Sequence, residues 1–249
     1  MKTRKPGFKS LDSAIYHLGS WYYHKQLRMR LQITGEEGLG MSILEERTKV
    51  LFIGDSVTDC GRNYEDQASL GAGYAFLAAA EFGRRYPEKQ VTFLNRGISG
   101  HRVKDLEERW DRDCLQLKPD YVSILIGIND TWRRYDQNDP TSVDNFKDGY
   151  RRLIERTLNQ GVKKLILMEP FVVPVHEEQQ GWYEDLNPKI QAVRSLAKEF
   201  GTLYVPLDGL INAASTGTGA AYWAEDGVHP STAGHGLIAD AWLSVVGAK

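Results

Sequence analysis

Residues 49–59 read KVLFIGDSVTD, and this stretch decides the fold. An uncharged apolar run follows Lys49 and leads directly into glycine and small polar residues. A short apolar run bounded by turn residues is typical of a strand that is buried on both faces. Similar runs recur downstream, with amphipathic helical patterns between them, which predicts a parallel sheet covered by helices. The predicted strands are residues 50–53, 91–95, 121–126, 164–168 and 203–207.

The segments between these strands carry apolar residues at spacings of three or four, as the buried face of a helix requires. Pro119 and Gly161 lie where two of these helices should stop. No repeat or linker interrupts residues 46–249, so we expect one domain there and an N-terminal appendage over residues 1–45. The predicted stripes are Val103, Leu106, Trp110, Cys114 and Leu117; Phe146, Tyr150, Leu153, Ile154 and Leu158; Ile190, Val193, Ala197 and Phe200; and Ala233, Leu237, Ile238, Ala241 and Trp242.

The composition excludes several classes of protein. The 249 residues carry a formal net charge of -2, so nucleic acid is not an expected partner. No stretch approaches the roughly 18 to 20 apolar residues of a membrane span. The basic first thirty residues lack the apolar core of a secretory signal. Two cysteines provide neither a disulfide framework nor the spacing of a metal site, so we expect a cytoplasmic protein.

The loops that follow the strands hold the candidate reactive residues, because ligands of such sheets bind at the carboxyl ends of the strands. Ser56 follows the first strand in a turn that can expose its hydroxyl. A lone turn serine is more often structural. Asp226 and His229, in DGVHP, are close enough for the carboxylate to accept the imidazole Nδ1 proton. Alternatively, they form an aspartate turn and a histidine that caps the last helix.

Acyl transfer also requires donors for the negative oxygen of the tetrahedral intermediate. Two loops each offer one donor: the backbone N–H of Gly97 after the second strand and the side-chain amide of Asn129 after the third. The alternative is that Gly97 allows a backbone conformation that a Cβ forbids, and that Asn129 forms a turn.

The chain resembles the SGNH, or GDSL-type, hydrolase superfamily in four segments, in this order: GDSVTD, NRGISG, IGIND and DGVHP. The resemblance covers residues 49–245 and departs from the family name only in Val57, where the name has leucine. It implies a three-layer α/β/α flavodoxin-like fold with a five-stranded parallel sheet, and a serine esterase without cofactor or metal. The residues that it implies for the triad and the oxyanion hole are Ser56, Asp226, His229, Gly97 and Asn129.

Within this superfamily, the chain is similar to the branch of bacterial acetylxylan esterases and sugar O-deacetylases. Trp132, Tyr222 and Trp223 are expected near the site, where aromatic faces stack on sugar rings or serve only as walls. That branch implies a tryptophan directly before the triad carboxylate. Here Glu225 holds that position, so the details of the pocket are not transferred.

The expected function is removal of O-acetyl groups from carbohydrates such as acetylated xylo-oligosaccharides. A lysophospholipase or thioesterase is the first alternative, but it would need a long apolar groove for which no extra segment is visible. A non-catalytic carbohydrate-binding protein on the same fold is the second. The segment 176–178 lacks the second histidine of a zinc helix, so no metal is expected. Relatives of this kind often self-associate, so a homo-oligomer remains among the expected partners.

Overall fold

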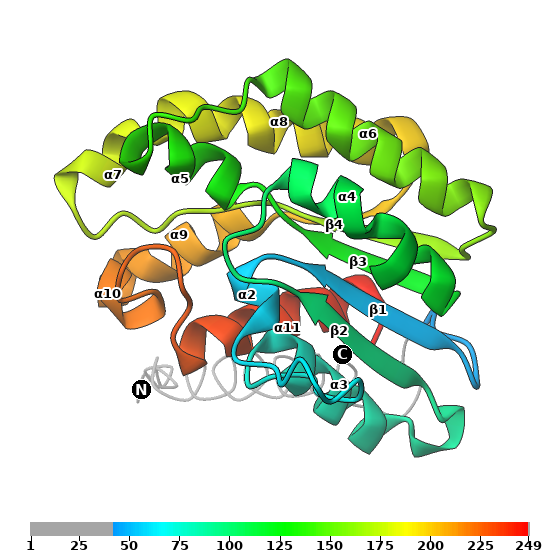
Figure 1. The fold of residues 1–249 in the computed structure, drawn as a ribbon. Coiled ribbons are helices and arrows are strands. Elements are labelled where there is room, and N and C mark those ends of the chain that lie inside the picture. Colours follow the sequence, from blue (N-terminus) through cyan, green and yellow to red (C-terminus); the bar gives the residue numbers. More distant parts are fainter. Residues whose placement is uncertain (1–41, 249) are drawn as a thin grey trace, which may run out of the picture. The chain divides into compact units, whose positions relative to one another are not determined.

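A computed structural model of the chain describes residues 42–248, so the expectation for the segment before residue 42 lies outside the described residues. All five strands are parallel, in the order β2-β1-β3-β4-β5 (Figure 1). This confirms the predicted five-stranded sheet. The strands are β1 (Lys49–Gly54), β2 (Thr92–Gly97), β3 (Tyr121–Leu125), β4 (Lys164–Met168) and β5 (Leu203–Val205).

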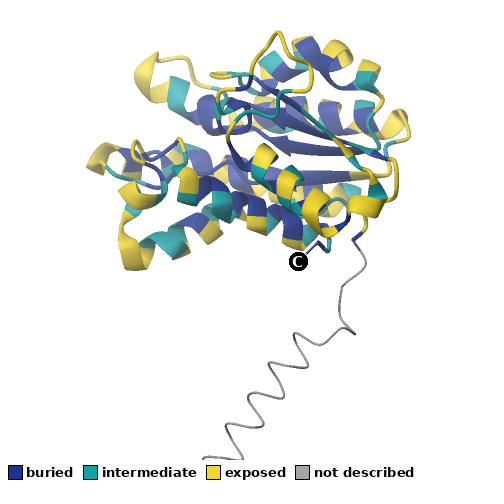
Figure 2. Cartoon of the chain, turned by 90° about the horizontal axis from the view of Figure 1, so that it is seen from below, coloured by how far each residue is buried: buried dark blue, intermediate teal, exposed yellow. Residues whose placement is uncertain are grey.

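Helices cover both faces of the sheet. One face packs against α3, α9 and α11, and the other against α4, α6 and α8 (Figure 1). The inward faces of these helices and the strands are buried, while the outer faces are exposed (Figure 2). The long helices are α3 (Tyr74–Arg85), α4 (Val103–Asp113), α6 (Val143–Asn159), α8 (Tyr183–Phe200), α9 (Leu207–Thr218) and α11 (Thr232–Val245).

The remaining helices lie in the loops. Four of them follow the carboxyl ends of strands or precede the last helix, and two are single 3₁₀ turns. Among residues 42–248, no helix has the length and apolar character that crossing a membrane demands. These short elements are α2 (Ser56–Asp59), α5 (Ile128–Asp136), α7 (Glu177–Gly181), α10 (Ala220–Trp223), η1 (Pro87–Lys89) and η2 (Leu115–Leu117).

The first three strands differ by one or two residues from their predicted bounds, and the start of the domain and the end of the last strand also differ. Leu44 is fully buried in the core, and the backbone N–H of Ile43 donates to the carbonyl of Val246. The domain therefore begins before the predicted boundary at residue 46. The last strand ends at Val205 and α9 begins at Leu207, because Pro206 between them has no N–H to donate to a sheet.

The strand order reverses direction between β1 and β3, and crevices for ligands form beyond the strands at such a point. Arg109 of α4 is buried beside the carboxyl ends of β1 and β2. Its Nη2 donates to the carbonyl of Gly54 at 3.0 Å, and its Nη1 donates to that of Arg96 at 2.7 Å. Its Nε donates to Nδ1 of His101 at 3.2 Å, and the guanidinium pairs with Asp113. One cation therefore joins the ends of β1 and β2 to the loop after β2.

Replacing Arg109 with methionine should lower the free energy of unfolding by about 3–5 kcal/mol, because the Gly54 and Arg96 carbonyls lose a charged donor and Asp113 keeps only the exposed Arg112 as an ionic partner. Arg112→Met is the matched control, since Arg112 pairs with the same Asp113 but is 69% exposed in its side chain. Its loss should cost less than about 1 kcal/mol. Urea unfolding of both variants measures the difference, and equal effects would contradict the structural role of Arg109.

Candidate active site

Ser56 is the first residue of α2, directly beyond the end of β1. The turn is tight, since a Cβ on Gly54 would lie 2.1 Å from the carbonyl oxygen of Leu125 on β3. Asp55 caps the helix by accepting the N–H of Val57 at 3.0 Å. As the first residue of the helix, Ser56 has no intrahelical acceptor for its own N–H. The turn therefore places the Ser56 hydroxyl and the Ser56 N–H at the point where the strand order changes direction.

His229 and Asp226 reach Ser56 from the other end of the chain. Nε2 of His229 lies 3.0 Å from Oγ of Ser56, and its Nδ1 lies 2.6 Å from Oδ2 of Asp226. The backbone N–H groups of Val228 and His229 donate to Oδ1 of Asp226 at 2.9 and 2.7 Å. Partial burial raises the pKa of Asp226, but the hydrogen bonds from His229 and Val228 outweigh it, so the pKa is lowered overall. An ionised carboxylate holds the proton on Nδ1 and leaves Nε2 as the acceptor for the serine hydroxyl.

Gln179 of α7 holds the turn that carries Asp226 through hydrogen bonds, and this residue was not predicted from the sequence. Its Nε2 donates to the Asp226 carbonyl at 2.7 Å, and its Oε1 accepts the N–H of Val175 at 2.9 Å. The N–H of Val173 also donates to the Gly227 carbonyl at 2.8 Å. The loop after β4 therefore supports the histidine turn. A single polar residue on a short helix gives no pattern from which this contact could be read.

Gly97 does not fit the expected role of oxyanion donor. Its N–H already donates to the side-chain Oδ1 of Asn95 at 2.8 Å, within its own strand. A Cβ on Gly97 would lie 2.2 Å from the backbone nitrogen of Asp59, so the glycine lets α2 pack against β2. Gly100, three residues later, is exposed with a φ of 80°, and its N–H donates to no acceptor within residues 42–248.

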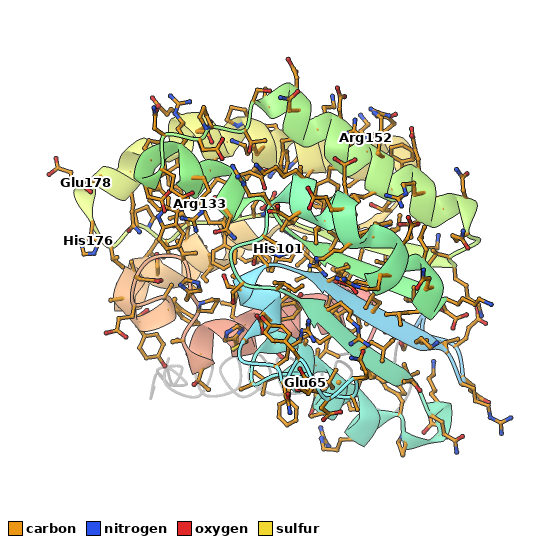
Figure 3. All side chains as sticks on the ribbon, in the orientation of Figure 1. Glu65, His101, Arg133, Arg152, His176 and Glu178 are labelled. Carbon is orange, nitrogen blue, oxygen red and sulfur yellow. The ribbon has the colours of Figure 1, made fainter. Side chains whose placement is uncertain are left out.

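Asn129 lies in the first turn of α5, after β3, and is 2% exposed. Its Nδ2 donates to the His101 carbonyl at 3.1 Å, and its Oδ1 accepts from Nη2 of Arg133 at 3.2 Å. Figure 3 shows where His101 and Arg133 lie at this end of the sheet. An amide nitrogen carries two hydrogens, and the second N–H of Asn129 has no acceptor among residues 42–248, so it can bind a ligand.

The three aromatic residues expected near the site occupy different surroundings. The ring of Trp132 lies 6.0 Å from that of His229 and 5.5 Å from that of Trp182, so it stands beside the candidate triad. Tyr222 and Trp223 contact each other on α10, edge to face. Trp223 lines an apolar cavity of about 630 Å³ between α9 and α11, and none of Ser56, Asp226 and His229 is among the described residues that line it.

Two buried carboxyl groups lie next to the candidate catalytic residues. Burial, helped by the charge of Asp130, raises the pKa of Asp55 to about 7, against the lowering effects of the hydrogen bond from Val57 and of His229. Burial likewise raises the pKa of Asp130 to about 7, although the N–H of Val103 donates to one of its oxygens at 3.1 Å. Both groups therefore change charge near neutral pH. Among residues 42–248, no cluster of histidine, cysteine and acidic side chains has the arrangement of a metal site.

The raised pKa of Asp55 predicts a pH-dependent stability. The native state keeps this proton up to about pH 7, whereas the unfolded chain releases it near 3.8, so the stabilisation is complete below 3.8 and lost as the pH rises through 7. Asp55→Asn keeps the acceptor for Val57 and cannot ionise. Its stability relative to wild type should rise by roughly 2–3 kcal/mol between about pH 5 and about pH 8 in urea unfolding. A difference that does not change with pH would rule this out.

Comparison with known proteins places the chain among ester hydrolases. The GDSL-like lipase/acylhydrolase family matches residues 52–237. Acetylxylan esterase of Geobacillus stearothermophilus is 39% identical over 207 residues, covering 80% of this chain and 94% of that protein. The uncharacterised lipoprotein YqeF of Bacillus subtilis (strain 168) is 27% identical over 120 residues, covering 43% of this chain and 49% of its own length.

Solved structures agree with this assignment. The crystal structure of Axe2, an acetylxylan esterase from Geobacillus stearothermophilus, superposes with a TM-score of 0.78 at 36% identity, covering 83% of this chain and 97% of that one. LAE5, an alpha/beta hydrolase from the metagenome of Lake Arreo in Spain, gives 0.77 at 32% identity, over 82% and 97%. Catalytic mutants of Axe2 have been solved in which a serine, an aspartate or a histidine is replaced by alanine. The chain belongs to the GDSL-like lipase/acylhydrolase family and is a carboxylic ester hydrolase.

Proposed function

We propose that this protein is a serine esterase that removes O-acetyl groups from carbohydrates, with Ser56, His229 and Asp226 as its catalytic triad. The observation that carries the proposal is the continuous line of hydrogen bonds from Asp226 through His229 to Oγ of Ser56. The similarity to acetylxylan esterase supports the substrate class. The replaced serine, aspartate and histidine in the Axe2 mutants support the same three residue types.

In the first half of the reaction, Oγ of Ser56 attacks the acetyl carbonyl carbon while its proton passes to Nε2 of His229. Asp226 keeps the imidazole oriented and stabilises its cation. The carbonyl oxygen becomes negative and accepts hydrogen bonds from the Ser56 N–H and the free N–H of Asn129. We assign the third donor to the N–H of Gly100 in place of Gly97, because the latter is already bound to Asn95.

The tetrahedral intermediate then collapses. The bond between the carbonyl carbon and the sugar oxygen breaks, and that oxygen takes the proton from His229 as the sugar alcohol leaves. Water attacks the acetyl group on Ser56 while His229 accepts a proton from it. The bond from the carbonyl carbon to Oγ of Ser56 breaks, His229 returns its proton to Oγ, and acetic acid leaves and ionises to acetate by releasing the second proton of water to solvent.

An aromatic side chain beside the triad suits a sugar substrate. Trp132 is partly exposed beside His229 and offers an aromatic face on which a sugar ring can stack. A lipid acyl hydrolase needs an apolar groove that reaches its nucleophile, and the apolar cavity that Trp223 lines does not supply one, because Ser56 is not among the described residues that line it. The free thiols of Cys60 and Cys114 suit a reducing compartment, and we propose the cytoplasm.

Wild-type protein should release acetate from acetylated xylobiose and should hydrolyse a long-chain p-nitrophenyl ester far more slowly than p-nitrophenyl acetate. Ser56→Ala should lower kcat by roughly a thousandfold or more, because it removes the nucleophile. Ser195→Ala on α8 is the matched control, since that hydroxyl only contacts the carbonyl of Ala192. Faster turnover of the long-chain ester would favour the lipid hydrolase. Unimpaired turnover by Ser56→Ala would exclude this serine as the nucleophile.

A further inference from the structure

We propose that Arg133 is a positioning residue that fixes the side-chain amide of Asn129 with an N–H turned toward the substrate. This rests on the proposed function, because it takes Asn129 as a donor to the substrate carbonyl oxygen. Arg133 itself need not touch the substrate.

The two residues lie four positions apart on α5 and so share one face of the helix. Nη2 of Arg133 donates to Oδ1 of Asn129 at 3.2 Å, and Nη1 pairs with Asp136. The Arg133 side chain is 18% exposed, compared with 44% for Arg134, which turns away to Glu184 on α8. Arg133 therefore has two terminal nitrogens with separate acceptors, one of which is the amide.

The chemistry of these partners allows only one orientation of the amide. A guanidinium has donors and no acceptor, so it can face Oδ1 of Asn129 but not Nδ2. The His101 carbonyl only accepts, and it faces Nδ2 at 3.1 Å. Rotating the amide by half a turn would place donor against donor at Arg133 and acceptor against acceptor at His101. Both contacts therefore favour the state in which the second N–H of Nδ2 is available.

The orientation matters because Oδ1 in the place of Nδ2 would repel the developing negative oxygen instead of stabilising it. The contact with His101 also ties Asn129 to the loop that contains Gly100. Removing Arg133 leaves only the His101 contact to hold the amide. Removing Arg133 should therefore destabilise the transition state and lower kcat, while substrate binding should change little.

Kinetics can distinguish the positioning of Asn129 from an alternative role of Arg133, which is to hold the ring of Trp132. The Cζ of Arg133 lies 5.3 Å from the centre of the Trp132 ring, which stands beside His229. If Arg133 served only to hold Trp132 as a sugar platform, its removal would raise KM and leave kcat unchanged. Action through Asn129 instead lowers kcat.

The test is a double-mutant cycle of Arg133→Met and Asn129→Ala, assayed for kcat and KM with p-nitrophenyl acetate and acetylated xylobiose. Arg133→Met should lower kcat about 10- to 100-fold with KM within about threefold, and Asn129→Ala about 100- to 1,000-fold. The double variant should be no slower than Asn129→Ala, because Arg133 then has no amide to orient. Arg133→Lys, which keeps a donor, should recover part of kcat. Arg134→Met is the matched control and should match wild type.

Each contrary outcome has its own meaning. Losses that multiply in the double variant, or an Arg133→Met variant with wild-type kcat, would overturn the positioning role while leaving the esterase intact. A rise in KM alone would overturn it in favour of contact through Trp132. If Asn129→Ala kept full activity, the assigned oxyanion hole would itself be wrong. Melting temperatures check folding, and Arg133→Lys carries the comparison if Arg133→Met fails to fold.

Discussion

The hydrogen bonds of the buried Arg109 guanidinium hold together the end of the sheet that carries the candidate active site. Parallel strands bring their carboxyl ends to one edge, where the loops that carry the candidate site begin. Arg109 donates to the carbonyls of Gly54 and Arg96 and to the ring of His101. The turn that begins at Ser56 and the loop that contains Gly100 are thereby held to one rigid helix.

Hydrogen bonds between side chains and backbone also hold the other parts of the candidate site. Asp55 caps the helix of Ser56, Gln179 fastens the turn of Asp226, and Asn129 binds the loop after β2. Each of these contacts fixes a group before any substrate arrives. Such preorganisation allows donors to stabilise developing charge without reorganising during the reaction. Its cost is visible in Asp55 and Asp130, whose burial disfavours their charged forms.

The sheet and the pairing of Asp226 with His229 could be predicted because their signals are local, whereas Ser56 was joined to them only by the resemblance of the four segments to the SGNH superfamily. Buried strands are continuous apolar runs, and Asp226 and His229 share one turn. The bond from the Gly97 N–H to the side chain of Asn95, which argues against Gly97 as a donor, was not foreseen because such a contact leaves no pattern in the sequence. Trp223 faces the cavity between α9 and α11 for a similar reason, since helix packing decides where its ring lies.

Two long helices and one contact of the candidate site also escaped prediction. Helices α3 and α9 were not predicted, although both cover the sheet. The contact of Arg133 with Asn129 depends on the rotamers of two polar side chains, which tertiary packing decides. The apolar pattern of the sequence decides which loops reach the candidate active site. Tertiary contacts between polar side chains then decide how the groups on those loops are oriented.

In the proposed reaction, Ser56 carries the acyl group during turnover. Rapid quenching of the enzyme with p-nitrophenyl acetate, followed by peptide mass spectrometry, tests it most directly. The account predicts the added mass of one acetyl group on the peptide that contains Ser56, formed as quickly as the first p-nitrophenol is released. Turnover with no acetylated peptide, or with the acetyl group on another residue that forms and decays at the rate of turnover, would contradict it.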